Sequence, residues 1–440
     1  MIDDILHTRR HFLRNGLALL SAAGTVPIFL ERTAWVVGDP LDRFRAKGDD
    51  GRILVVLQLA GGNDGLNTII PYRNDLYYRA RPRLGIARES AFQLTSEIGL
   101  HPSATGLKQL YDQGHLAVLQ GIGYPNPDRS HFVSTDIWST ADPQGRQHEG
   151  WIGRYLDCTC KGADRPNPRL GIAITQEAPL AMQGKQFNPV SFGTPDELSW
   201  RGAGPDSPGH AAFDHLNDST GGPQKSGALT SEAAALSYLE RTAMDARASA
   251  REIQQAAGSS GRAARPDPRP IPGNKTRGGS QLSQQLGMVH RMIAAGLNTK
   301  VYYVSLGGFD THANQANRHQ QLMTQLGDAL AEFVGGLKTD GLLDRVLIVT
   351  FSEFGRRVTE NASQGTDHGA AAPLFVMGGK VRAGVYGAHP SLESSDLDQG
   401  DLKWQTDFRS VYATVLRNWL SADASKVLGG SFKPMDFLKA

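Results

Sequence analysis

The chain has 440 residues, and its 46 lysine and arginine residues nearly balance its 44 aspartate and glutamate residues, giving a formal net charge of +2. A nucleic-acid-binding surface needs a marked basic excess, so the composition argues against nucleic acid as a partner. Hydrophobic residues make up 40% of the chain, which is enough for a large core.

The first predicted element is an export signal. Residues 8–13 read Thr-Arg-Arg-His-Phe-Leu, the pattern of a twin-arginine signal, and a modest apolar stretch follows at residues 16–30. Gly24 and Pro27 interrupt this stretch, which is also too short for a permanent membrane span. We therefore expect residues 1–48 to be signal and linker. The Tat translocase would be a partner during export, and the protein would reach the periplasm or the cell exterior without a stable membrane span.

Residues 49–440 are predicted to form a single domain in which strands and helices alternate. Apolar, β-branched runs at residues 53–59, 116–122, 171–175, 301–306, 345–351 and 374–377 indicate buried strands. Apolar spacing predicts helices at residues 104–112, 130–138, 282–297, 315–337 and 408–420, the last with Thr406 as its N-cap. This alternation predicts an α/β fold with a doubly wound, mostly parallel sheet flanked by helices.

A flexible insertion is expected within this domain, over about residues 201–279. Its two ends, 201–225 and 258–279, are rich in Gly, Pro and Ser and poor in apolar residues. Such segments bury too little surface to offset the entropy lost on ordering.

Four motifs place polar side chains close to strand ends. The first three directly follow predicted strands, and open parallel sheets bind ligands beyond the carboxyl ends of their strands. Asp, Glu and His are also the residues that hold divalent metals. The sequence therefore predicts a metal or anion site at this edge. The motifs are Gly-Gly-Asn-Asp-Gly at 61–65, Gly-Phe-Asp-Thr-His at 308–312, Ser-Glu-Phe-Gly-Arg-Arg at 352–357 and Gly-Thr-Asp-His-Gly at 365–369.

The first two motifs each offer a pair of metal ligands. Asn63 and Asp64 follow a glycine turn and provide oxygen donors, although an Asx turn that caps its own backbone is the alternative. Asp310 and His312 lie two residues apart, so an extended segment points both side chains toward one ion.

The other two motifs leave alternatives open. Asp367 and His368 either bind an ion together in an irregular loop, or Asp367 fixes the tautomer of the histidine. Glu353 either binds metal or forms a structural ion pair with Arg356 or Arg357. In the first case an arginine is free to orient an anionic substrate.

A further motif, Arg-Ser-His-Phe at residues 129–132, begins a predicted helix after a strand. Ser130 is either an N-cap or a nucleophile at the positive end of the helix. In the second reading Arg129 and His131 are candidates for acid–base catalysis or for stabilising an oxyanion. No Gly-x-Ser-x-Gly elbow surrounds Ser130, which argues against a serine hydrolase of that type.

Together, the export signal and the five motifs in this order resemble the exported bacterial family called domain of unknown function 1501. The resemblance covers nearly the whole chain and implies an alkaline-phosphatase-like core, because that family is related to the alkaline phosphatase and sulfatase superfamily. By this resemblance Asp64 is the metal-binding aspartate of the first strand and Ser130 is the nucleophile. Asp310 and His312 stand near the Asp/His ligand pair of one metal.

Residues 365–368 resemble the Gly-Thr-Asp-His segment of phosphopentomutases, in which the histidine binds metal. Two departures argue against a second metal ion. Phe354 stands where a histidine is expected, and Asn314 stands where the spacing of the second motif would put one. One ion is therefore expected, either Ca²⁺, Mg²⁺ or Mn²⁺, or a single Zn²⁺.

These features predict an exported, metal-dependent hydrolase of phosphate or sulfate esters. Its substrate would be an anionic small-molecule or polymer ester, attacked by Ser130 or by water. The alternative is a non-catalytic exported binding or assembly protein on a degenerate phosphatase or sulfatase fold.

Overall fold

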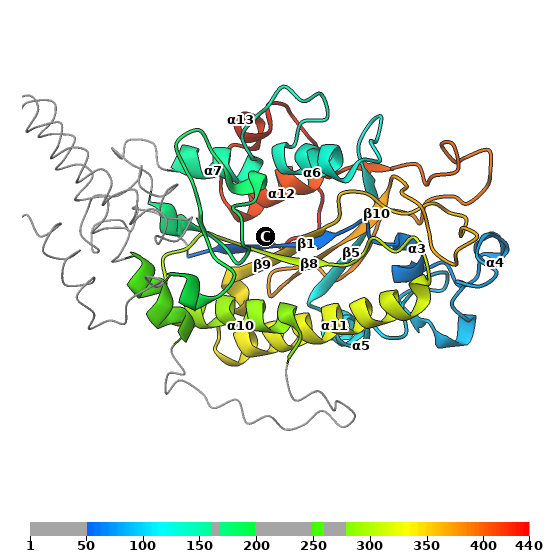
Figure 1. Cartoon of the computed structure of the whole chain (residues 1–440), viewed down its shortest axis with the longest axis horizontal. Helices are drawn as coiled ribbons and strands as arrows, with labels where there is room; N and C mark the ends of the chain where they lie inside the picture. Colours follow the sequence, from blue (N-terminus) through cyan, green and yellow to red (C-terminus); the bar gives the residue numbers. More distant parts are fainter. Residues whose placement is uncertain (1–50, 160–166, 199–248, 259–278, 440) are drawn as a thin grey trace, which may run out of the picture.

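The computed structural model describes residues 51–159, 167–198, 249–258 and 279–439 (Figure 1). The predicted export signal and most of the predicted flexible insertion lie outside these residues. Within them, no helix is long and apolar enough to cross a membrane.

A nine-stranded mixed sheet forms the centre of the fold, and its main path runs in the order β11-β5-β10-β9-β1-β8-β6-β7. β1 lies between β8 and β9 and is parallel to both. β12 pairs with β5 off the main path. The strands are β1 (Ile53–Ala60), β5 (Leu116–Gly123), β6 (Gly171–Ala173), β7 (Val190–Ser191), β8 (Val301–Gly307), β9 (Val346–Phe351), β10 (Ala372–Gly378), β11 (Gly384–Tyr386) and β12 (Thr406–Asp407).

One strand reverses direction, and this reversal positions the site. β10 is antiparallel to both of its neighbours, β9 and β5. The chain therefore enters β10 at the edge of the sheet where β1, β5, β8 and β9 end. The motif at residues 365–369 precedes β10, so it reaches the same edge as the motifs that follow the parallel strands.

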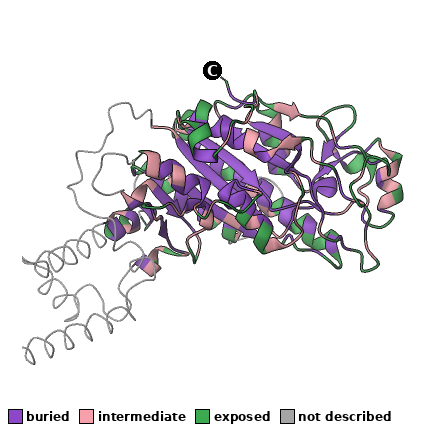
Figure 2. Ribbon diagram, turned by 90° about the horizontal axis from the view of Figure 1, so that it is seen from above, coloured by how far each residue is buried: buried purple, intermediate pink, exposed green. Residues whose placement is uncertain are grey.

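Helices cover both faces of the sheet (Figure 1). One face carries α5 (Thr105–Asp112), α10 (Gln281–Ala294) and α11 (Gln315–Thr339). The other carries α6 (His131–Thr140), α7 (Trp151–Thr159), α12 (Phe408–Thr414) and α13 (Ala424–Leu428). Two separate apolar clusters lie between the sheet and these layers, and Figure 2 shows buried segments along the middle of the molecule with exposed ones toward its outside. The predicted doubly wound, mostly parallel α/β fold is confirmed.

A smaller lobe extends from the end of β1. It holds α3 (Gly65–Thr68), α4 (Asp75–Ala80) and a three-stranded sheet of β2 (Ile69–Ile70), β3 (Phe92–Gln93) and β4 (Gly99–Leu100). A third apolar cluster, which includes Tyr72 and Tyr77, packs this lobe against the loops before β10 and before β12.

The last predicted helix differs from its prediction in two ways. Its N-cap is Asp407, whose side chain accepts a hydrogen bond from the backbone of Arg409, and Thr406 belongs to β12 instead. The α-helical part ends at Thr414, and residues Val415–Trp419 continue as a π-helix. The apolar face is continuous across this change, which is why spacing alone predicted one long helix.

Candidate metal centre

Four loops meet at the carboxyl edge of the central strands. They follow β1, β5, β8 and β9, and the loop after β9 leads directly into β10. Close approach of these backbones depends on glycine. Gly61 has a φ of +117°, and a side chain there would collide with the backbone of Phe309 and Asp310. A side chain at Gly365 would likewise collide with the backbone of His312.

Asp310, His312 and His368 bring three ligand atoms together. Oδ1 of Asp310 lies 2.9 Å from Nε2 of His312 and 3.2 Å from Nε2 of His368. The two histidine Nε2 atoms lie 2.9 Å from each other. Asp310 and His312 are each about half-exposed, with a side-chain exposure of 45%. These three atoms therefore form a compact set that solvent reaches.

His131, the first residue of α6, lies at the edge of this set. Its Nε2 is 3.5 Å from the second oxygen of Asp310, and this nitrogen is buried without a hydrogen-bond partner. Ligand atoms of His131, Asp310 and His368 all lie within 4.8 Å of one another. The imidazole of His131 is thus close enough to contact a ligand bound between Asp310, His312 and His368.

The Nδ1 atom of each imidazole faces an oxygen acceptor. His131 Nδ1 lies 2.8 Å from Oε1 of Glu353, and His312 Nδ1 lies 3.2 Å from Oδ1 of Asp367. His368 Nδ1 lies 2.8 Å from the carbonyl oxygen of Arg129. A carbonyl oxygen only accepts, so His368 carries its hydrogen on Nδ1, and the carboxylates favour the same tautomer for the other two rings. Each neutral ring then directs the lone pair of its Nε2 toward Asp310.

Asp310 is held as an anion. Desolvation raises its pKa, but the hydrogen bond from Arg356 and the charge of the same guanidinium outweigh this and hold the pKa below its usual value. The carboxylate is therefore ionised at neutral pH and available to a cation.

Arg356 braces this carboxylate and is closed to substrate. Its side chain is fully buried, and it donates to the carbonyl oxygens of Gly61, Gly62, Thr366 and Phe309 as well as to Asp310, at 2.7 Å. The prediction that Arg356 binds an anionic substrate is therefore wrong for this arrangement, because the side chain is buried and each of its three nitrogens donates to a group inside the protein.

Glu353 forms neither of its predicted ion pairs. Oε1 accepts from the backbone N–H of Gly61 at 2.8 Å and from His131, whereas Oε2 is buried without a hydrogen-bond partner. Phe354 lies beneath two of the imidazoles, with ring centroids 4.8 Å from His131 and 4.6 Å from His368. The position that departs from the family resemblance thus supports the rings by packing.

Asp64 and Asn63 are buried, and their side chains contact other residues than the three ligands. Oδ2 of Asp64 accepts from Nη1 of Arg81 at 2.5 Å and from Gln315, and both charged side chains are buried. Asn63 Oδ1 accepts from the hydroxyl of Thr68 at 2.8 Å. The metal-ligand reading of this pair is corrected, because the Arg81 guanidinium supplies the positive charge that Asp64 needs.

Ser130 occupies the N-cap position of α6 without capping it. Its φ and ψ are extended, its side chain makes no capping hydrogen bond, and its N–H donates to Asp128 at 2.6 Å. The interpretation of Ser130 as a side-chain N-cap is therefore wrong, and its role as a nucleophile stays a prediction.

Arg129 and Arg357 converge on one buried carboxylate, Asp401. Arg129 donates to Oδ2 of Asp401 at 2.8 and 2.5 Å, and Nε of Arg357 lies 3.7 Å from Oδ1. Burial raises the pKa of Asp401, although hydrogen bonds from Arg129 act in the opposite direction. Each arginine side chain keeps an exposure of 38%, so both still face solvent in part.

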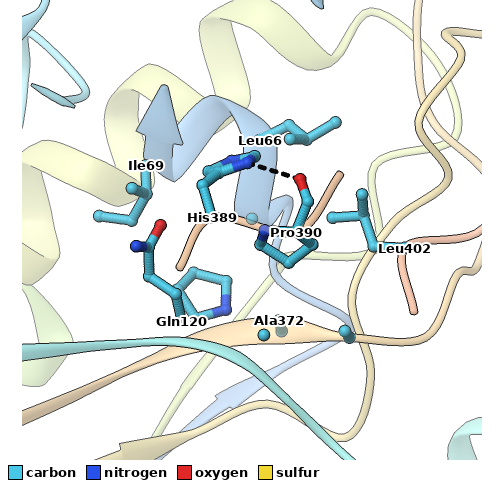
Figure 3. A pocket seen from close by; sticks show the side chains of 11 residues that line it. Leu66, Ile69, Gln120, Ala372, His389, Pro390 and Leu402 are labelled. Atoms are coloured by element: carbon cyan, nitrogen blue, oxygen red, sulfur yellow. Dashed lines mark hydrogen bonds between the residues drawn. The ribbon is translucent and has the colours of Figure 1, made fainter. Parts of the chain in front are cut away.

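A separate small pocket lies near α3 and β10 (Figure 3). It is lined by Leu66, Ile69, Pro390 and Leu402, with His389 and Gln120 as its polar members. His389 Nδ1 is engaged with the carbonyl oxygen of Pro390 at 2.8 Å. None of the candidate metal ligands lines this pocket, so it does not belong to the candidate centre.

Sequence reasoning did not identify the partners of several charged residues. Arg81, at the end of α4, neutralises Asp64, and Asp401 pairs with Arg129 and Arg357. His131 was predicted as a catalytic residue without its link to Glu353. The link has one sequence signal, because both residues follow strands that end at the same edge.

Family membership is shown by sequence. A profile of the family described as "Protein of unknown function (DUF1501)" matches residues 120–424. The chain belongs to this DUF1501 family, as its motifs predicted. The matched region contains all the candidate residues except Asn63 and Asp64.

Several solved structures are similar to this DUF1501 protein at low identity. The lipoteichoic acid synthase LtaP from Listeria monocytogenes is 10% identical with a TM-score of 0.33, and the match covers 87% of this chain and 81% of that one. The C-terminal periplasmic domain of EcEptC from Escherichia coli, in complex with Zn, is 10% identical with a TM-score of 0.35, covering 78% and 77%. PsFucS1 sulfatase from Pseudoalteromonas sp. is 11% identical with a TM-score of 0.37, covering 93% and 75%. No curated protein sequence matches the chain.

Proposed function

We propose that this protein is a hydrolase of phosphate or sulfate esters that uses one divalent metal ion, held by Asp310, His312 and His368. The observation that carries the proposal is the 2.9 Å separation of the two histidine Nε2 atoms beside an ionised carboxylate. With both Nδ1 atoms bound to oxygen acceptors, three lone pairs face one another. Such a set repels itself unless a positive charge lies among them, either a metal ion or an added proton.

The donor set favours a particular class of ion. Two imidazole nitrogens and one carboxylate oxygen suit Zn²⁺ and related transition metals, whereas Ca²⁺ and Mg²⁺ prefer oxygen ligands. Catalytic zinc sites keep three protein ligands and one position for substrate. When bound, such an ion supplies Lewis-acid polarisation of the ester oxygen.

The surrounding residues have separate tasks in this proposal. His131 exchanges a proton at Nε2, because Glu353 fixes its Nδ1 and leaves Nε2 without a partner. Ser130, at the positive end of α6, is the candidate nucleophile. Arg129 and Arg357, both partly exposed, are the cations available to an anionic ester.

Metal content is the first test. Purified protein should carry one transition-metal ion, and His312→Ala and His368→Ala should lose it. His290→Ala is the matched control, since His290 pairs with Asp340 away from the centre. At a hundredfold excess over Kd, metal should stabilise the wild-type protein by roughly 2.7 kcal/mol. Wild-type protein with no metal and no thermal shift on adding Zn²⁺, Mn²⁺, Mg²⁺ or Ca²⁺ would overturn the proposal.

Turnover of an aryl phosphate and an aryl sulfate is the second test. Ser130→Ala and His131→Ala should each abolish turnover while the metal remains bound. Loss of metal from His131→Ala would instead make His131 a fourth ligand.

A non-catalytic binding or assembly role is the second candidate. The pairing of Asp64 with Arg81 and the internal use of Arg356 favour it, because both remove groups that a phosphatase of the resembled type would use. Metal-loaded protein that binds phosphate but hydrolyses none of a panel of phosphate and sulfate esters would support this role.

Export by the twin-arginine route, to the periplasm or the cell exterior, is part of the proposal. It is supported by the Arg9-Arg10 pattern near the N-terminus. Replacing both arginines with lysine should retain the protein in the cytoplasm, and unchanged export of that variant would refute the route.

A further inference from the structure

Among the described residues, the large hydrophobic side chains that are exposed are Phe132, at 86%, and Val133, at 44%. Both follow His131 directly in the first turn of α6. Adjacent Cα atoms are about 3.8 Å apart, so the Cα atom of Phe132 lies at this distance from that of His131, a residue of the candidate centre. Apolar exposure is thus concentrated beside this centre.

The fold itself does not need these two side chains on the surface. α6 buries its other face, where Ile137 and Trp138 join the apolar cluster on that side of the sheet. Phe132 contributes nothing to this cluster, and exposing a phenyl ring forgoes the favourable transfer from water. Binding of a ligand would explain why two adjacent apolar side chains are exposed at this position.

The neighbouring charges indicate what kind of ligand fits. Arg129 lies three residues before Phe132, and it shares Asp401 with Arg357 while both keep part of their surface exposed. Cations and an apolar surface therefore lie on either side of His131 along the chain. An amphiphilic anion matches both.

We propose that Phe132 and Val133 bind the apolar group of the substrate, so that the site takes esters in which the phosphate or sulfate is attached to an aromatic or alkyl group. This inference rests on the proposed function and narrows its substrate class. The size of the surface supports a small ligand over a second copy of the chain. Stable protein interfaces bury about 800 Å² on each partner, whereas an aromatic side chain offers only about 150–250 Å².

The test uses zinc-loaded full-length protein and two non-hydrolysable probes, phenylphosphonate and methylphosphonate. Wild-type protein should bind the phenyl compound about tenfold more tightly, the ratio expected when part of a ring is removed from water. Phe132→Ser should remove most of this preference without changing zinc affinity or the binding of methylphosphonate. Val133→Ser should reduce the preference less. Asp136→Ser, an exposed change on the same helix, is the control and should leave it unchanged.

The outcomes separate this inference from the proposed function. A phenyl preference that Phe132→Ser removes supports the inference even if no ester is hydrolysed. An unchanged preference in Phe132→Ser overturns it while leaving metal-dependent hydrolysis intact. Failure of wild-type protein to bind either phosphonate overturns both the anion site and the apolar subsite. A wild-type dimer that Phe132→Ser converts to a monomer on size-exclusion chromatography would assign this surface to self-association and also overturn the inference.

Discussion

Asp64 and Asp310 follow neighbouring parallel strands at the same edge of the sheet, yet their surroundings are opposite. Asp64 is buried and its charge is balanced by Arg81. Asp310 is about half-exposed and faces imidazole nitrogens that lack protons in their neutral form. Asp310 also contacts a guanidinium, that of Arg356, but it stays about half-exposed and its carboxylate still faces His312 and His368. This difference in exposure and in the neighbouring imidazoles locates the candidate centre.

Among the changes that test this difference between Asp64 and Asp310, removal of the Arg81 charge should have the largest effect on stability. Arg81→Met should destabilise the protein by about 3–5 kcal/mol, because it leaves the charge of Asp64 buried and unpaired. Chemical denaturation of metal-free protein measures the change. The double variant Arg81→Met with Asp64→Asn should recover much of the loss.

Measuring the number of metal ions that Arg81→Met binds shows whether this interpretation of Asp64 is wrong. If Arg81→Met kept its stability and bound an additional metal ion, Asp64 would be a latent ligand and the contrast with Asp310 would fail.

The next largest effect should be seen in how the stability of the protein changes at acidic pH, because a buried histidine contributes to it. His101 contacts His319, with ring centroids 5.4 Å apart, and burial together with the charge of His319 lowers the pKa of His101 from 6.5 to about 3. The unfolded chain takes up this proton near pH 6.5, whereas the folded protein resists it until about pH 3. The unfolded state therefore binds more protons within this window, and stability falls as the pH drops through it.

His101→Asn should make this fall shallower, because asparagine retains an acceptor for the N–H of Ser103 but does not titrate. Denaturation in the presence of a chelator, between pH 7 and 4, should show a slope lower by up to about 1.4 kcal/mol per pH unit. Equal slopes for the variant and the wild type would contradict the assignment.

A smaller effect is expected around the exposed centre. Asp367→Asn should weaken metal binding by about 10–100-fold, the range typical of residues that orient a metal-binding histidine. The physical reason is the contact between Asp367 Oδ1 and His312 Nδ1, at 3.2 Å, in which an amide is a weaker acceptor. Competition with a chelator measures the affinity.

Asp340→Asn provides the control for this change, because Asp340 forms a comparable contact with His290 at 2.8 Å away from the centre. Equal loss of metal in Asp340→Asn and Asp367→Asn would show that the effect is not specific to the centre.

Glu353→Gln should reduce turnover more than metal affinity, since Glu353 contacts His131.

The main strands were predictable because each is an apolar run between polar turns. β1, β5, β8 and β9 begin within one residue of the predicted positions and end within one. The reversal of β10 was not predictable, because a buried run looks the same in either direction. That reversal nevertheless explains why a motif preceding a strand joins motifs that follow strands.

The sequence predicted part of the candidate site but not how its residues pair. Asp310, His312 and His368 lie together as predicted, whereas Asp64 does not join them. Nothing in the sequence couples Asp64 to Arg81, seventeen residues later at the end of another helix, or Arg129 to Asp401. Such pairs are formed by the tertiary fold, and only charge balance in the buried state reveals them.

The smallest expected effect concerns Asp401, which acts on the centre through Arg129. Asp401 holds the Arg129 guanidinium, and the carbonyl oxygen of the same residue accepts from His368 Nδ1 at 2.8 Å. Asp401→Asn removes the charge that fixes Arg129, so the acceptor of His368 becomes less well placed. Because the change is transmitted through a backbone, we expect a loss of metal affinity below the roughly 10–100-fold predicted for Asp367→Asn.

Arg357→Gln should retain metal affinity, since Arg357 contacts Asp401 only at 3.7 Å and its side chain makes no described contact with an imidazole. If Asp401→Asn lowered the melting temperature but left metal affinity unchanged, Asp401 would serve the fold alone, and the link from the buried carboxylate to the exposed centre would be broken.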